Sequence, residues 1–143
     1  MKRRTTLGQG IGFWLLFFGI YLHATESSAH RPVSTYSIVA LDPETKELGV
    51  AVQSHWFSVG ILVPWAKAGV GAVATQSFVK VEYGPEGLKL MEKGNTAEEA
   101  LRKLLAGDEG EAVRQVAMID INGTVATHTG ERCIIAAGHQ TGK

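Results

Sequence analysis

Alternating apolar and polar positions predict a hairpin near the start of the folded part of the chain. Tyr36–Leu41 and Leu48–Gln53 are rich in β-branched and small apolar residues, as strands are. Between them lies Asp42-Pro43-Glu44-Thr45, with Asp at the first and Pro at the second position of a type I turn. We therefore expect two antiparallel strands, the second of them buried on both faces.

A third strand is predicted further along. Ser58–Trp65 is apolar, but Pro64 interrupts it and has no amide hydrogen to donate to a sheet. Ala66–Gly71 is small and glycine-rich, and we expect it to be a tight connection. Ala72–Phe78 returns to the pattern of a strand.

In the middle of the chain the apolar spacing lengthens and predicts two helices. The first, Tyr83–Lys93, ends at Gly94-Asn95, residues that favour a helix C-cap. The second, Ala97–Ala106, is preceded by Thr96, which pairs with Glu99 in the pattern of a capping box. The residues expected on the apolar faces are Leu88, Leu90 and Met91 in the first helix, and Ala100, Leu101, Leu104 and Leu105 in the second.

The last part of the chain predicts three more strands. Arg114–Ile121 alternates, and Thr124–Thr129 follows Asn122-Gly123, a pair that accepts positive φ in a type I′ turn. Cys133–Ala137 is the expected final strand. Helices gathered between two groups of hairpin strands indicate a layered α+β domain with antiparallel sheets.

The first 29 residues predict a signal peptide. Lys2-Arg3-Arg4 precedes Ile11–Leu22, an uncharged run whose helix would be about 18 Å long against a hydrocarbon core of roughly 30 Å. Ser27-Ser28-Ala29 then provides a small-x-small cleavage site. We expect a periplasmic or extracellular protein without a stable membrane anchor, in which residues 30–34 form a short polar arm.

Length and charge narrow the remaining possibilities. The 143 residues suffice for one domain, which we place at residues 35–143. Without the signal peptide, 11 basic and 13 acidic residues leave a net charge of −2, which does not indicate binding to nucleic acid. Cys133 is the only cysteine, so an internal disulfide is excluded. The histidines lack metal-motif spacing, and we expect neither a metal nor a cofactor.

Several long blocks of the sequence are distinctive. They are STYSIVALDPETKELGVAVQSHWFSVG, VPWAKAGVGAVATQSFV, YGPEGLKLM, RQVAMID and CIIAAGHQTG, and they run from about Thr35 to Gly142. Together they resemble the Ntn-hydrolase-like family catalogued as domain of unknown function 1028. The resemblance implies a four-layer αββα sandwich, in which two antiparallel sheets face each other between outer helices.

The resemblance also implies a chemistry. In Ntn hydrolases an N-terminal Thr, Ser or Cys attacks an amide-type C–N bond, and its own α-amine accepts the proton. A free α-amine has a pKa of about 7.7–8.0, which suits a general base near neutral pH. Thr35 matches the opening of the family pattern and is the candidate nucleophile. The alternative for Thr35 is an ordinary β-branched residue that opens a strand.

The sequence departs from the family pattern at both ends. Cleavage after Ala29 leaves His30–Ser34 in front of Thr35, so a second cut is needed to free its amine. The family continues beyond the block that ends near His139, whereas this sequence stops at Lys143. We therefore expect a fragment with an incomplete sheet, whose exposed edge favours a homo-oligomer.

Four further residues are candidates for the site. Ser54 and His55 follow a strand, but adjacent residues of an extended chain point to opposite faces and do not form a ready pair. Gln76 lies in a polar cluster that could donate hydrogen bonds to an oxyanion. His139 follows Ala-Gly and could be a base or a ligand-binding residue. The alternative in each case is a solvated strand end or a side chain that satisfies loop backbone.

Two functions stay open at this point. One is an exported amidohydrolase of the N-terminal nucleophile type, acting on a small molecule or a peptide. The other is a non-catalytic extracytoplasmic binding or scaffold domain on the same fold. The first residue of the mature protein separates them, because Thr35 favours the enzyme and His30 favours the binding domain.

Overall fold

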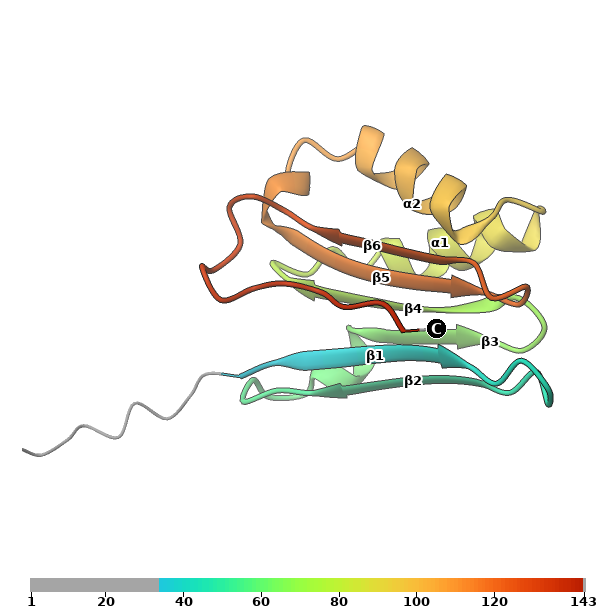
Figure 1. Cartoon of the computed structure of the whole chain (residues 1–143). Coiled ribbons are helices and arrows are strands. Elements are labelled where there is room, and N and C mark those ends of the chain that lie inside the picture. Colours follow the sequence, from blue (N-terminus) through green and yellow to red (C-terminus); the bar gives the residue numbers. More distant parts are fainter. Residues whose placement is uncertain (1–33, 143) are drawn as a thin grey trace, which may run out of the picture. The chain divides into compact units, whose positions relative to one another are not determined.

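A hairpin and a four-stranded sheet, both antiparallel, and two α-helices make up the described part of the chain (Figure 1). The computed structural model describes residues 34–142. The expected signal peptide, its cleavage site and residues 30–33 of the polar arm lie outside this range. None of the described helices is both long and apolar enough to cross a membrane.

The first hairpin pairs β1 (Tyr36–Leu41) with β2 (Leu48–Gln53), as the sequence predicts. Asp42 shapes the connecting turn, since its Oδ1 accepts from the amides of Glu44 (2.8 Å) and Thr45 (3.0 Å). The expectation that the second strand is buried on both faces is wrong. Burial alternates along both strands, because no described element covers the outer face of the hairpin.

The second sheet has the order β3-β4-β5-β6, with every neighbouring pair antiparallel. Its strands are β3 (Pro64–Lys67), β4 (Gly71–Ser77), β5 (Arg114–Asp120) and β6 (Val125–Thr129). The predicted interruption at Pro64 is instead the first residue of β3, where a missing amide hydrogen does little harm. The connection expected at Ala66–Gly71 is shorter than predicted, because β3 continues through Lys67.

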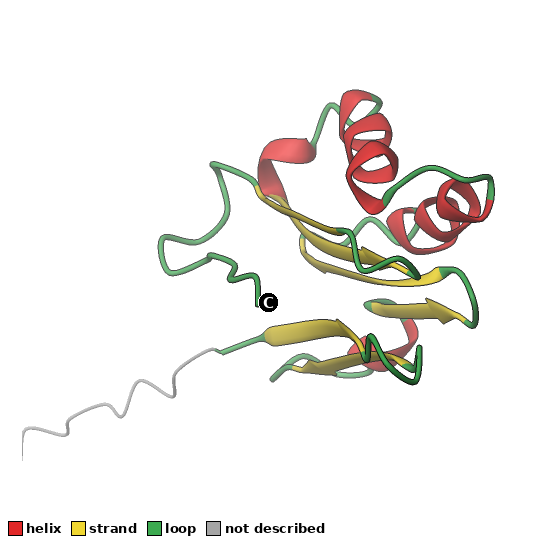
Figure 2. Cartoon of the chain, turned by 45° about the vertical axis from the view of Figure 1, so that its right-hand side comes forward, coloured by secondary structure: helices red, strands yellow, loops and turns green. Residues whose placement is uncertain are grey.

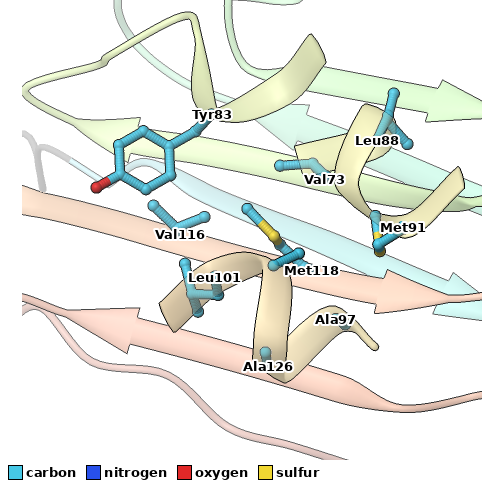
Figure 3. Close-up of a cluster of buried hydrophobic side chains, with 10 residues drawn as sticks. Val73, Tyr83, Leu88, Met91, Ala97, Leu101, Val116, Met118 and Ala126 are labelled. Atoms are coloured by element: carbon cyan, nitrogen blue, oxygen red, sulfur yellow. The ribbon is translucent and has the colours of Figure 1, made fainter. Parts of the chain in front are cut away.

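Helices α1 (Tyr83–Glu92) and α2 (Ala97–Ala106) cover one face of this sheet. The capping box is confirmed: the Glu99 amide donates to Thr96 Oγ1 (3.2 Å) and the Thr96 amide to Glu99 Oε2 (3.1 Å). Tyr83 and residues from both helices pack with the sheet in a buried core (Figure 3). The fully or nearly buried members are Val73, Tyr83, Leu88, Met91, Ala97, Ala100, Leu101, Val116, Met118 and Ala126.

The turn between β5 and β6 differs from the predicted type I′ turn. Gly123 has a φ of +90°, but Asn122 is not among the residues with positive φ. The Gly123 amide donates to the Asp120 carbonyl (3.0 Å), and the Asp120 amide donates to the Thr124 carbonyl (3.1 Å). This is the pattern of a type I turn closed by a glycine bulge.

The predicted final strand, Cys133–Ala137, is also wrong. The segment after β6 forms turns, in which the Cys133 amide donates to the Gly130 carbonyl (3.0 Å) and the Ala137 amide to the Ile134 carbonyl (2.8 Å). Ile134 and Ile135 are exposed. Apolar β-branched residues alone do not make a strand when no partner strand is available.

The described residues form three layers: the helices, the four-stranded sheet and the hairpin (Figure 2). The fourth layer that the resemblance implies would lie on the outer face of the hairpin and is not among residues 34–142. The inner faces of the two sheets carry small, apolar and uncharged polar side chains. They are Ser37, Val39, Leu41, Leu48, Val50, Val52, Pro64, Ala66, Ala72, Ala74, Gln76, Gln115, Ala117, Ile119, Val125, Thr127 and Thr129.

Candidate functional site

Several strand ends meet on one side of the domain. There β1 and β5 begin, and β2, β4 and β6 end, at the left of Figure 1. We call this side the polar end, because hydroxyl and amide side chains follow the strands there. Thr35, Ser54, Gln76 and the segment that carries His139 all belong to it.

Two of the predicted residues are hydrogen-bonded to each other at the polar end. Thr35 Oγ1 lies 2.8 Å from Ser54 Oγ, and Ser54 Oγ also accepts from the Trp56 amide at 3.1 Å. Thr35 directly precedes β1 and Ser54 directly follows β2, where Tyr36 pairs with Gln53. The hairpin register therefore brings together two hydroxyls that are 19 residues apart in sequence.

Gln76 lies on the inner face of the four-stranded sheet. The residue is 3% exposed, and its neighbour Thr75 points the other way, toward the helices. Directly across on β5 lies Gln115, which the sequence analysis did not single out. Gln76 is thus a buried amide at the strand end, in keeping with its selection as a possible hydrogen-bond donor.

His139 is anchored to this same sheet through Gln115. His139 Nδ1 lies 3.0 Å from Thr129 Oγ1, and Gln115 Nε2 donates both to Thr129 Oγ1 (3.2 Å) and to the Gly138 carbonyl (2.9 Å). Within residues 34–142, no hydrogen bond joins this group to the Thr35–Ser54 pair. The polar end therefore has two halves, one on each sheet.

His55 does not join either half. Its ring lies 5.3 Å from the ring of Trp56, and both side chains are exposed. Ser54 directly follows β2, and His55 lies in the bend after it. The part of the chain that the structure describes also holds no group of three or more His, Cys, Asp or Glu placed to bind a metal ion.

Cys133 lies at the polar end, although not in a strand. Its thiol donates to Ser77 Oγ (3.5 Å) and to the Arg114 carbonyl (3.4 Å), and the residue is half-buried. Ser77 itself has a φ of +66°, a conformation that is uncommon for residues other than glycine. These contacts attach the segment after β6 to the end of β4.

A buried ionic network lies behind the polar end, on the helix side of the sheet. Asp108 accepts from Arg114 Nε (2.9 Å), Tyr83 Oη (3.1 Å) and the Gly110 amide (3.1 Å), and pairs with Lys80 Nζ (3.2 Å). Hydrogen bonding to Arg114 holds the pKa of Asp108 well below its usual range. Burial, together with the hydrogen bond to Asp108, raises the pKa of Tyr83 well above its usual range.

This network supports the backbone next to the candidate site. Arg114 Nη1 donates to the Phe78 carbonyl (2.6 Å), two residues beyond Gln76. Its members come from two stretches of the sequence, residues 78–83 and 108–114. Sequence reasoning missed them because the contacts between these stretches are visible only in the structure.

Two hollows lie away from the polar end. One, of about 250 Å³, is at the opposite end of the sheet and is lined in part by Gly94, Asn95 and Asp120. The other, of about 350 Å³, is open and lies between α2 and β6, beside Leu105 and Val125. None of the predicted site residues lines either hollow.

The fold and the site thus define a mixed α+β domain with hydroxyl and amide side chains at one end of two facing antiparallel sheets. The chain belongs to the family of unknown function DUF1028, whose family model matches residues 35–143.

A solved structure supports this assignment. The chain is similar to the crystal structure of protein SPO2555 from Silicibacter pomeroyi, described as a DUF1028 protein, with 32% sequence identity and a TM-score of 0.68. The similarity covers 71% of this chain and 48% of that one, so the chain spans about half of the length of the structure it matches. No curated protein matches the chain.

Proposed function

We propose that this chain is an exported Ntn-hydrolase-like protein that hydrolyses an amide-type C–N bond at the polar end, with Thr35 as the nucleophile. The observation that carries the proposal is the hydrogen bond of 2.8 Å between Thr35 Oγ1 and Ser54 Oγ. It holds the hydroxyl at the start of β1, where an N-terminal nucleophile belongs. The family match also begins at Thr35.

The reaction follows from a chain that starts at Thr35. Its α-amine accepts the hydroxyl proton while Oγ1 bonds to the carbonyl carbon of the amide. Side-chain donors at the polar end, Gln76 and Ser54, stabilise the oxyanion that forms. The protonated amine then gives its proton to the leaving nitrogen as the C–N bond breaks, and water hydrolyses the resulting ester.

Two other predicted residues have different places in this scheme. His139, held by Thr129 at 3.0 Å, contributes a ligand-binding or proton-accepting ring beside Gln115. His55 stays a prediction without geometric support, because it neighbours Trp56 on the exposed side.

The four-layer αββα arrangement is part of the same proposal. The two facing sheets with helices outside one of them support it. The outer face of the hairpin supports it as well, because Tyr36 (65% exposed) and Ile38 (58% exposed) form an apolar surface of the kind that helices cover.

Variants of Thr35 test the chemistry. With exported full chain and a panel of primary carboxamides, acyl anilides and dipeptides, Thr35→Ala should abolish turnover, whereas Thr35→Ser keeps the hydroxyl and should retain part of it. Thr45→Ala, in the turn at the far end of the hairpin, is the matched control. The rate should rise through about pH 7–8, as the α-amine loses its proton. Unchanged turnover in Thr35→Ala contradicts the proposal.

A non-catalytic binding domain is the second candidate. It is favoured by the surroundings of Thr35, whose hydroxyl contacts Ser54 but, in residues 34–142, no His or carboxylate that would act as a base. If Thr35 keeps Ser34 in front of it, no base is available for nucleophilic attack. The binding domain predicts a stable mature protein that begins at His30 and turns over none of these amides.

A further inference from the structure

Gln76 is almost fully buried, and its side-chain amide has no hydrogen-bond partner among the described residues. It is 3% exposed, and no residue of the described range forms a hydrogen bond with its amide. Yet no fully buried side-chain nitrogen or oxygen in this range lacks a partner. The small accessible surface of Gln76 therefore includes its amide nitrogen and oxygen, which remain open to a ligand or to water.

The register of the sheet fixes the direction in which Gln76 points. Val73 and Thr75 belong to the helix side, since Val73 is part of the helix-packed core and Thr75 Oγ1 donates to the Lys80 carbonyl (3.4 Å). Successive strand residues alternate between faces. Gln76 therefore points toward the hairpin that carries Thr35 and Ser54.

Gln115 adds a second open group directly beside the first. It is paired with Gln76 across the ladder, and cross-strand side chains in such pairs start only about 5 Å apart. Gln115 Nε2 donates to Thr129 Oγ1 and to the Gly138 carbonyl, and a carbonyl can only accept, so the orientation of this amide is fixed. Its Oε1 has no partner in the described residues.

The surroundings of the pair are uncharged. No Asp, Glu, Lys or Arg lies on the inner faces of the described strands, and Arg114 is engaged with Asp108 on the helix side. A charged ligand group would be desolvated here without a counter-ion, which is unfavourable. The site therefore suits a neutral polar group.

We infer that Gln76 and Gln115 recognise a neutral primary carboxamide. The carboxamide oxygen accepts from Gln76 Nε2, one of its N–H groups donates to Gln76 Oε1, and the other donates to Gln115 Oε1. A trans secondary amide does not fit in this way, because its C=O and N–H point to opposite sides. This inference deepens the proposed function, on which it rests for the scissile bond: the substrate is R–CO–NH₂, and the products are a carboxylate and ammonia.

Binding of small probes tests the inference without requiring turnover. Exported full chain labelled with ¹⁵N is titrated with propionamide, propionate and N,N-dimethylpropionamide, and the side-chain amide signal of Gln76 is followed by NMR. Propionamide should give a saturable shift. The dimethyl compound and propionate should bind about tenfold more weakly or worse, since each loses hydrogen bonds that propionamide makes.

Variants assign the effect to these residues. Gln76→Met keeps the length of the side chain but removes its hydrogen bonds, and should weaken propionamide binding about tenfold. Gln76→Glu keeps the shape, removes both donors and should weaken it as well. The matched control is Gln53→Met, which alters a glutamine at the same end of the hairpin on its exposed outer face. Preserved dispersion of the backbone spectrum shows that each variant is folded.

Three results would overturn the inference: no saturable shift in the wild type, equal affinity for propionate, or the same loss in Gln53→Met. Each of these results would contradict recognition of a primary carboxamide by Gln76. Thr35→Ala should still bind propionamide. Loss of amide turnover in that variant with intact binding therefore separates the chemistry from the recognition, and intact turnover without propionamide binding rejects the recognition alone.

Discussion

The two faces of the four-stranded sheet differ in how completely their buried polar side chains are hydrogen-bonded. On the helix face, Asp108 has four partners, and Asp120 accepts from the amides of Ala97, Asn122 and Thr124. On the inner face, no residue of the range 34–142 forms a hydrogen bond with the side chain of Gln76 or with the side-chain carbonyl of Gln115. Buried polar groups that have hydrogen-bond partners stabilise the fold, whereas polar groups at a strand end without such partners are available to a ligand.

This contrast separates stability from binding. Substitutions on the helix face should cost free energy of unfolding, because they leave buried groups unsatisfied. Substitutions of the open groups should cost little stability but should change what the protein binds.

The largest expected effect is at Asp108. Asp108→Ala removes the counter-ion of Arg114, which is only 17% exposed, and should lower the free energy of unfolding by about 3–5 kcal/mol. Urea denaturation followed by circular dichroism measures it. Glu109→Ala, at the exposed neighbouring position, is the control. A loss below about 1 kcal/mol would show that the network does not hold the helix face together.

Gly123 tests the turn that Asp120 organises. Gly123→Val places a β-branched residue at a φ of +90° and should cost about 1–3 kcal/mol. Gly49→Val is the matched control, because Gly49 lies in β2 with open space around it and an ordinary φ, where Val suits a strand. Equal changes in the two variants would contradict the turn geometry.

The free energy of unfolding at acid pH tests the Asp108 network as well. The pKa of Asp108 is lower in the folded state, so its contribution is present above about pH 4 and is lost as the pH falls toward the folded-state pKa. The difference in unfolding free energy between wild type and Asp108→Asn should therefore shrink between pH 5 and pH 3. A difference that is constant over this range would contradict the assigned shift.

The smallest expected effect on stability is at Gln76. Gln76→Met breaks no hydrogen bond to a described residue, so its free energy of unfolding should stay within about 1 kcal/mol of the wild type. Thermal denaturation measures this. A loss of 3 kcal/mol or more would mean that the amide is structural, and the contrast between the faces would fail.

Local signals in the sequence were sufficient for much of the fold. The capping box at Thr96 gave the start of α2, and Asp42-Pro43 gave the turn of the first hairpin. Such features depend on residues a few positions apart, which is why the sequence alone predicts them.

The two errors have different origins. The turn at Asn122-Gly123 is shaped by the Asp120 carboxylate, whose Oδ1 accepts from the amides of Asn122 and Thr124, so the local signal lay in Asp120 rather than in the Asn-Gly pair. Cys133–Ala137 has strand composition but no strand partner within residues 34–142. Strand pairing depends on distant parts of the chain, which a local pattern does not contain.

The candidate site was predicted in part for the same reason. Thr35, Ser54, Gln76 and His139 stood out as polar residues at strand ends or in a family pattern. Gln115 and the Asp108 network did not. Gln115 becomes a candidate only through its pairing with Gln76 across β4 and β5, and the network is recognised only from the hydrogen bond between Tyr83 and Asp108. Side chains that act through cross-strand neighbours are visible only once the strands are paired.

The central claim is that Thr35 becomes a free N-terminal nucleophile, and the first residue of the exported protein tests it most directly. Intact mass and N-terminal peptide sequencing by mass spectrometry should find a mature chain that begins at Thr35, after cleavage at Ala29 and a second cleavage after Ser34. A single stable species that begins at His30, with Thr35 still in a peptide bond, would contradict the N-terminal mechanism.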